Sequence, residues 1–375
     1  MNGFPAVDPI PLPAPVWLFK ALHLVTLALH FISVEMLLGG LLVATWLSFF
    51  GANRPGNAAA ALRLNASAAI GRRLPVVMTY VINLGVPPLL FAQVLYGRAI
   101  YTSSVLIGVY WIAVVFLLMA AYWLLYRFAA GTEAGEAVWW KGLLAWLLAG
   151  AIAKIYTTNL TLMLRPEVWQ SMYSASASGT HLPPPDPTLM PRWLFMLSGG
   201  LWVAGLWMIW LAGRKSFEAP VRSYLATIGG RLALVMVPVQ AVVAYLVLAA
   251  QPDVVRAQLA SSPLYRYAGF ICLGAAVLVA GFGGWASVRK PQSRGAGYVS
   301  LVLLLLAMLG MTVYRDGIRD LTLLSKGFAV WQRTVVTNWS VVGLFLVLFV
   351  AGLVGLGWLV SVVMRARPVS EKVVS

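Results

Sequence analysis

Two histidines lie in the first long apolar segment of the chain, which runs from about Val16 to Phe50. His23 and His30 are seven residues apart, close to two helical turns, so both imidazoles are expected on one side of a helix. Glu35 follows them in the same segment. Ionisable side chains are costly in hydrocarbon and usually mark a pathway or a ligated cofactor. Imidazole at this depth therefore points first to ligation of a haem iron.

The composition is that of a membrane protein. Of the 375 residues, 61% are hydrophobic and only 10% are charged, whereas a soluble domain has about 25% charged residues. Repeated long apolar runs predict an all-α integral membrane protein with about nine transmembrane helices, so that residues 1–375 form a single transmembrane domain. The expected spans are 17–50, 75–97, 104–129, 138–164, 192–213, 230–251, 266–287, 296–314 and 338–364.

The distribution of Lys and Arg among the loops predicts the orientation. More basic residues fall on the inner side if the N-terminus is outside and the C-terminus inside a bacterial inner (cytoplasmic) membrane. Residues 165–191 then form the longest extracytoplasmic loop, whose Pro-rich part predicts an extended or partner-docking segment. Residues 366–375 form a cytoplasmic tail, and residues 53–73 are expected to form an interfacial helix on the inner side.

The charge and the cysteine content exclude several classes of function. The net charge of +16 comes from residues scattered through short loops, which favours contact with anionic lipid headgroups over nucleic acid. The single cysteine, Cys272, rules out an intrachain disulfide, a cysteine metal cluster and covalent attachment of c-type haem. The first residues, MNGFPAVDPIPLPAPVW, lack a basic region, which predicts no cleaved signal peptide.

Three segments carry a family resemblance. They are LALHFISVEMLLGGLLVATWL in the first span, VINLGVPPLLFAQVLYG at 81–97, and LLAWLLAGAIAKIYTTNLTLMLRPEVWQ at 143–170. Together they resemble helices of subunit I of the cytochrome bd-type quinol oxidases. The resemblance implies nine spans with the N-terminus outside, and it places His30 at the position of a haem ligand near the outer face. His23 has no counterpart in it.

The same comparison shows departures at the positions that would hold the other haems. The third span contains YWIAVVFLLMAAYW (110–123) and no carboxylate, where the family has a glutamate. Leu194 or Phe195 stands where the resemblance implies a histidine ligand, and Phe270 stands near the position of the methionine ligand.

Two further segments depart from the family. Residues 252–265 are too short for its quinol-binding loop, and VYRDGIRD (313–320) replaces its Gly-Arg-Gln-Pro-Trp motif. We therefore expect a divergent, non-oxidase member of this superfamily that does not reduce oxygen.

Charged residues elsewhere have both functional and structural interpretations. Glu35 and Lys154 lie deep in expected spans, so they predict either a mutual ion pair that packs helices or a proton or charge path. Arg315 and Arg319 lie on one helical face just beyond the eighth span. They could contact haem propionates or the acidic surface of a partner; the alternative is a self-satisfied surface network with Asp316 and its neighbours.

Three hypotheses follow for the function. In the first, the chain is an electron-transfer oxidoreductase subunit that holds one or two b-type haems through His30 and His23. It would pass electrons between a membrane quinol (menaquinol or ubiquinol) and c-type or multihaem cytochrome subunits in the periplasm. In the second, it is a haem-free structural or anchoring subunit of a respiratory complex. The role of His23 is open: it could ligate a second haem, bond a haem propionate or sit at the headgroup level. The third is a secondary transporter with Glu35 and Lys154 along its path, against which stands the lack of an internal repeat in the hydropathy.

Overall fold

Nine long helices make up most of the computed structural model, which describes residue 4 and residues 11–53, 56–288 and 294–365. They are α1 (Val16–Ala52), α3 (Leu74–Leu106), α4 (Gly108–Glu133), α5 (Trp139–Leu162), α7 (Leu189–Ala212), α8 (Ala219–Ala249), α10 (Pro263–Val288), α11 (Arg294–Ser325) and α12 (Trp339–Arg365). Within the described residues, eight helices are long and apolar enough to cross a membrane, and α12 adds a shorter apolar stretch, Trp339–Gly355. The expected all-α, multi-span fold is confirmed. The orientation of the chain in the membrane stays a prediction, and the expected tail 366–375 lies outside the described residues.

Short helices lie in several connections between the long helices; the one within residues 53–73 was expected, and the others were expected to be plain loops. They are α2 (Ala58–Gly71), α6 (Trp169–Ala175), α9 (Asp253–Ser261) and two single 3-10 turns at Pro166–Val168 and Val330–Gln332. The loop 165–191 is therefore partly helical, although its Pro-rich part at 180–187 has no helix, as expected. The short connection after α8 is mostly taken up by α9.

The helix expected within residues 53–73 is α2, and it packs along α1. Its first turn is capped by Asn57, whose side chain accepts a hydrogen bond from the backbone N–H of Ala59 at 2.9 Å. The Ser67 hydroxyl donates to the carbonyl oxygen of Ala44 in α1 at 2.8 Å. This bond fixes α2 to the C-terminal third of α1; its expected place at the membrane interface stays a prediction.

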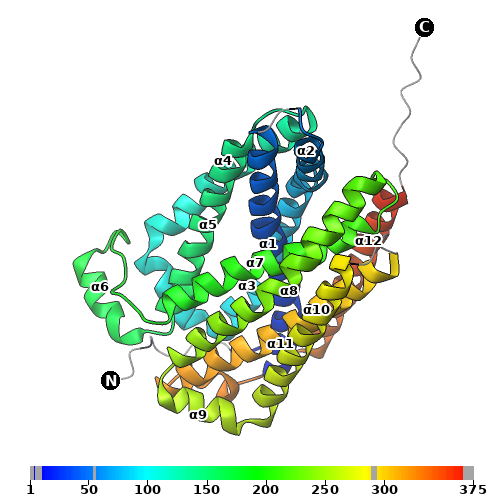
Figure 1. Cartoon of the computed structure of the whole chain (residues 1–375). Helices are drawn as coiled ribbons and strands as arrows, with labels where there is room; N and C mark the ends of the chain where they lie inside the picture. The colour runs from blue at the N-terminus through cyan, green and yellow to red at the C-terminus, as the bar shows by residue number, and fades with distance from the viewer. Residues whose placement is uncertain (1–3, 5–10, 54–55, 289–293, 366–375) are drawn as a thin grey trace.

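Helix α1 is the central element of the bundle (Figure 1). It has 37 residues, and at about 1.5 Å per residue its length of about 55 Å exceeds the ~30 Å of a hydrocarbon core. It contacts α2, α3, α5, α7 and α11. Polar side chains on α1 are therefore enclosed by several other helices rather than by lipid.

The crossing of α1 and α7 depends on glycine. A Cβ on Gly39 would lie 1.7 Å from the carbonyl oxygen of Gly200, and a Cβ on Gly200 would lie 2.9 Å from the backbone nitrogen of Gly39. The two backbones can approach this closely only because neither residue has a side chain.

Helices α8 and α11 extend well beyond their expected spans, as α3 does at its C-terminal end. Helix α8 begins at Ala219 rather than near residue 230, and α11 continues to Ser325 rather than ending near residue 314. The extension of α11 includes Asp316, Arg319 and Asp320. These residues were expected beyond the span, but they are buried, and the two aspartates pair with Lys20 of α1. Because their charges are compensated, they do not end the apolar helix.

Helix α3 contains two prolines, Pro87 and Pro88, and has a break in its helical backbone at another position. Both prolines lie inside the helix, and the non-helical backbone is at Tyr96, with φ −124° and ψ 21°. Tyr96 is fully buried, and its side chain takes part in the polar cluster described below.

Gly39→Ala should destabilise the protein by about 1–3 kcal/mol, the usual cost of overpacking, because the new methyl group would overlap the backbone of α7 at Gly200. Thermal unfolding of the purified protein in detergent measures the change. Gly274→Ala is the matched control, because a Cβ there meets nothing within 4 Å. Equal unfolding temperatures for the two variants would contradict the close crossing.

Candidate functional site

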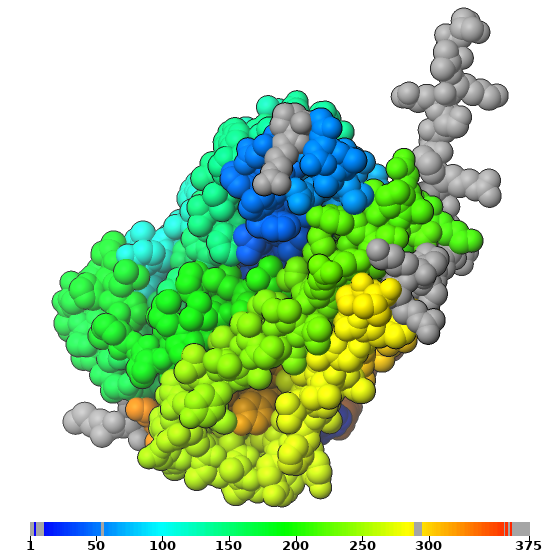
Figure 2. All heavy atoms as spheres, in the orientation of Figure 1, coloured from blue at the N-terminus to red at the C-terminus, as the bar shows by residue number. Residues whose placement is uncertain are grey.

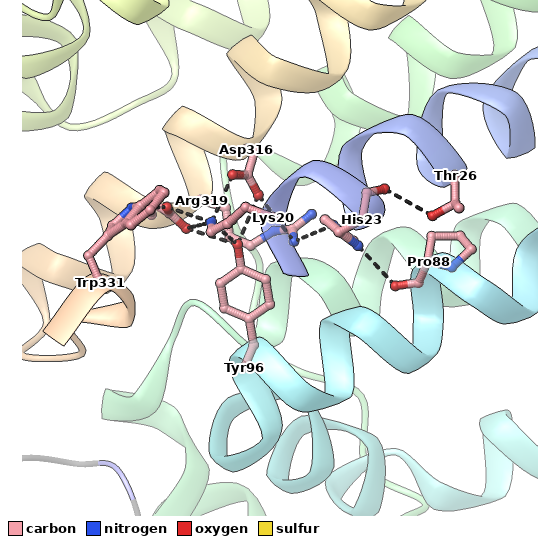
Figure 3. A network of polar contacts seen from close by, with 9 residues as sticks. Lys20, His23, Thr26, Pro88, Tyr96, Asp316, Arg319 and Trp331 are labelled. Carbon is pink, nitrogen blue, oxygen red and sulfur yellow. Dashed lines mark hydrogen bonds and ion pairs between the residues drawn. The ribbon is translucent and has the colours of Figure 1, made fainter. Parts of the chain in front are cut away.

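Six polar side chains meet where α1 begins and form what we call the charge cluster. Helix α1 contributes Lys20 and His23, and α3 contributes Tyr96. Helix α11 contributes three residues that lie within about one helical turn of each other. All six are 6% exposed or less. The cluster is shown in Figure 3 and consists of Lys20, His23, Tyr96, Asp316, Arg319 and Asp320.

The ammonium group of Lys20 lies at the centre of the charge cluster. Its Nζ lies 2.8 Å from Asp316 Oδ2, 2.6 Å from Asp320 Oδ2 and 2.5 Å from the Tyr96 hydroxyl. An ammonium group has three N–H donors, so these three partners satisfy it. The Tyr96 hydroxyl is in turn 2.8 Å from Asp316 Oδ1 and 2.9 Å from Asp320 Oδ1. Helices α1, α3 and α11 are thereby joined through one buried cation.

His23 has both ring nitrogens in hydrogen bonds with protein groups. Its Nε2 is 3.0 Å from Nη1 of Arg319, and its Nδ1 is 3.0 Å from the carbonyl oxygen of Pro88. Because a guanidinium can only donate, Nε2 must accept and Nδ1–H must donate to Pro88. This assigns a neutral imidazole with its proton on Nδ1. The arrangement opposes the expectation that His23 is a haem ligand, because neither nitrogen has a lone pair to spare.

The formal charges of the cluster cancel. Two cations, Lys20 and Arg319, meet two carboxylates, Asp316 and Asp320, and Arg319 Nη1 is also 3.6 Å from Asp316 Oδ1. An isolated buried charge costs several kcal/mol, and pairing with complete hydrogen bonding offsets that cost. Of the alternatives expected for Arg319, its contacts are closest to the self-satisfied network with Asp316, although that network is buried and not at the surface.

Trp331 covers the cluster on the solvent side. Its Nε1–H donates to Asp320 Oδ2 at 3.1 Å, and its ring centroid is 5.7 Å from Lys20 Nζ. The side chain itself is 54% exposed. Trp331 is therefore a surface residue that contacts the buried ion pair of Lys20 and Asp320 directly.

His30, two turns further along α1, has a different environment. Its Nδ1 is buried and has no hydrogen-bond partner, and its ring is 6.0 Å from that of Phe31. The ring packs against α3 where Gly85 has no side chain; a Cβ there would lie 2.9 Å from Cε1. His30 interacts with the backbone of Val81 in α3, and its Nδ1 has no hydrogen-bond partner, whereas both nitrogens of His23 are bonded.

Arg315 of α11 contacts α1 at Phe31, the residue after His30. Its guanidinium is 5.3 Å from the centre of the Phe31 ring, and its Nη1 is buried without a hydrogen-bond partner. The contact with an aromatic face supplies part of the stabilisation that a carboxylate would give. The residue therefore retains a donor for an anionic group.

Glu35 is enclosed between α1, α7 and α8. It is 3% exposed, and its Oε2 has no hydrogen-bond partner. A Cβ on Gly199 would lie 2.8 Å from Glu35 Oε1 and 2.7 Å from Gln240 Nε2, so the three residues share one contact region. The Gln240 amide donates to the carbonyl oxygen of Phe195 at 3.1 Å.

The expected ion pair between Glu35 and Lys154 does not occur among the described residues. Lys154 Nζ is 2.8 Å from the sulfur of Met190 and 5.0 Å from the ring centre of Trp193. Lys154 is only partly buried and contacts α7 from α5, whereas Glu35 is buried on α1. A proton or charge path through either residue stays a prediction.

The sequence analysis missed three members of this site. Lys20 is three residues before His23 and therefore on the same helical face, a spacing that could have drawn attention to it. Tyr96 and Trp331 carry no such signal, because aromatic residues are common throughout the chain. Over the described residues, there is also no group of three or more His, Cys, Asp or Glu side chains placed to hold a metal ion.

Comparison with known proteins shows a likeness of fold. No family model and no curated protein matches the chain. Among solved structures, the chain is similar to one from the bd oxidase of Geobacillus thermodenitrificans, with a TM-score of 0.65 and 11% sequence identity. The match covers 98% of this chain and 100% of that one. The chain therefore shares the fold of a bd oxidase chain over nearly its whole length.

Lys20→Met should destabilise the protein by about 3–5 kcal/mol, because removing the cation leaves the buried Asp320 carboxylate without an ion-pair partner and Asp316 with Arg319 alone. Thermal unfolding in detergent measures the loss. Lys154→Met is the matched control, since that lysine is partly exposed and has no carboxylate partner in the described structure. The double variant Lys20→Met/Asp320→Asn should recover part of the loss; failure to recover any of it would contradict the role assigned to the ion pair.

Proposed function

We propose that the chain is a membrane subunit of a respiratory redox complex and that it holds a single b-type haem through His30. The observation that carries the proposal is the buried Nδ1 of His30, which has no hydrogen-bond partner. Buried polar atoms are nearly always satisfied, so an unsatisfied one calls for a ligand. The fold shared with a bd oxidase chain supports the same function.

Two residues near this position would serve one haem. When bound, haem supplies one-electron redox chemistry, with a potential set by its axial ligand and surroundings. His30 would bind the iron, and the close fit of its ring against Gly85 fixes the ring orientation. Arg315, whose guanidinium lies over the ring of Phe31, would donate an N–H of its unpartnered Nη1 to a propionate.

The charge cluster limits the number of haems. His23 donates to Pro88 and accepts from Arg319, so ligation would require both α3 and α11 to release it. We therefore revise the expected one or two haems to one. In this proposal, His23 and Arg319 are positioning residues that hold α1 against α3 and α11, and His30 is the ligand.

The proposed electron partners follow the sequence-based expectation. Quinol in the membrane would supply electrons, and c-type or multihaem cytochrome subunits in the periplasm would receive them. The sequence has no carboxylate at 110–123 and no long loop at 252–265. Those absences support electron transfer without oxygen reduction.

A haem-free structural subunit is the second candidate. The observation that favours it is the charge cluster itself, in which every charged group finds a protein partner at the end of α1. Such a network stabilises a scaffold and needs no cofactor. The two candidates differ in a property that spectroscopy measures directly.

His30→Ala should abolish the b-type absorbance in reduced-minus-oxidised spectra of the purified protein, because the iron loses its protein ligand. The pyridine haemochrome assay should give one haem per chain before the substitution and none after it. His23→Ala is the matched control; it should retain the haem while lowering the unfolding temperature.

Wild-type protein without haem would exclude the first candidate and support the second. Loss of the spectrum in His23→Ala, with the spectrum retained in His30→Ala, would contradict the assignment of the ligand. A count of two haems per chain would contradict the limit that the charge cluster sets.

A further inference from the structure

A second group of cations lies at the opposite end of the bundle and forms what we call the arginine cluster. Its members are Arg72 and Arg73, just before α3, and Arg214, just after α7. The guanidinium groups of Arg72 and Arg73 are 5.2 and 4.8 Å from the centre of the Phe217 ring, and that of Arg214 is 4.2 Å from the Trp210 ring. The two aromatic side chains bring cations from two separate connections together.

The distance along α3 between the charge cluster and the arginine cluster indicates that the arginine cluster lies at a membrane surface. Tyr96 and Arg73 are 23 residues apart in the chain, so about 35 Å of helix separates the charge cluster from the arginine cluster. This distance is slightly more than the ~30 Å thickness of a hydrocarbon core. If the charge cluster lies near one interface, the arginine cluster lies at the headgroup level of the other, which the loop charges predict to be the inner side.

The cations of the cluster repel one another. The charges of Arg72 and Arg214 act unfavourably on Arg73, and the described residues provide no carboxylate in ion-pair distance of Arg72 or Arg73. Arg73 Nη1 donates to the carbonyl oxygen of Ala69 at 2.6 Å, which helps to cap the C-terminal end of α2. Capping uses one of the five N–H donors of a guanidinium. It accounts for the position of Arg73 but not for the adjacent Arg72.

We propose that the arginine cluster binds the phosphate of an anionic phospholipid. Guanidinium groups bind phosphate with paired, charge-assisted hydrogen bonds, and basic pockets between helices on the cytoplasmic side bind anionic lipid headgroups. A phosphate between Arg72 and Arg73 removes their mutual repulsion. This proposal does not depend on haem binding.

An apolar groove between α2 and the start of α8, lined in part by Glu218, the residue after Phe217, favours a lipid over free phosphate. It has a volume of 410 Å³ and is lined by Ala58, Leu62, Pro220 and Val221 among others. These residues belong to α2 and the start of α8, which lie next to each other on the face shown in Figure 2. Glu218 also lines the groove and would repel a phosphate there. We therefore assign the phosphate to the arginines and an acyl chain to the groove.

The test is lipid binding by the delipidated, full-length protein, measured by native mass spectrometry with phosphatidylglycerol or phosphatidylcholine. Wild-type protein should retain phosphatidylglycerol in preference to phosphatidylcholine. Arg72→Gln/Arg73→Gln should bind phosphatidylglycerol about 30-fold more weakly, from ~1 kcal/mol per basic residue near a lipid surface. Arg127→Gln, which removes an exposed arginine outside the cluster, should bind it like the wild type.

Thermal unfolding with added lipid or inorganic phosphate identifies the source of the phosphate. A rise in unfolding temperature with phosphatidylglycerol alone supports the lipid, and an equal rise with inorganic phosphate alone would overturn the lipid assignment. Equal retention of the two lipids by the wild type would overturn the proposal without any variant. Equal phosphatidylglycerol binding by the double variant and the wild type would overturn it as well.

Discussion

The burial of Lys20 between two carboxylates is the interaction on which the rest of the structure depends. A lone ammonium group in an apolar bundle would cost several kcal/mol, so Lys20 requires Asp316, Asp320 and Tyr96 to be in place together. That requirement brings α3 and α11 against the first turns of α1. Once they are there, Arg319 reaches His23 and Pro88 reaches its other nitrogen. The protonation and hydrogen bonding of His23 are thus consequences of an ion pair one turn away.

The likeness to a bd oxidase chain at 11% identity shows how little of the sequence the fold requires. A membrane bundle needs apolar helices of sufficient length and small residues where backbones cross. This chain has such small residues at Gly39 and Gly200, where α1 crosses α7. Neither condition specifies which polar residues are buried. A chain can therefore keep this bundle while its internal polar groups change, and the charge cluster is one such set of groups.

The nine long helices of the described residues could be predicted from the sequence, because each contains a run of apolar residues long enough to indicate a membrane span. The ends of α8 and α11 could not, since they depend on whether charged residues are paired with other helices. For the same reason, Arg319 was expected at a surface, although the shared face of Asp316, Arg319 and Asp320 followed from their spacing. The break of α3 at Tyr96 coincides with the end of the expected span 75–97, where Gly97 follows Tyr96, but the sequence did not predict that the helix continues beyond it to Leu106.

The histidines show the same limit most clearly. Their spacing places His23 and His30 on one side of α1, and spacing alone treats them alike. Contacts from other helices separate them: His23 is bonded at both nitrogens, whereas Nδ1 of His30 has no partner. The contact of His23 with Arg319 joins residues 296 positions apart and that with Pro88 joins residues 65 positions apart, and no local pattern encodes either.

An experimental density map of the purified protein, obtained by cryo-electron microscopy, tests this account most directly. The account predicts the Lys20 side chain between Asp316 and Asp320, with the Arg319 guanidinium in hydrogen-bond distance of His23 and no iron at that histidine. Density for a haem ligated by His23, with Arg319 turned away from the ring, would contradict it.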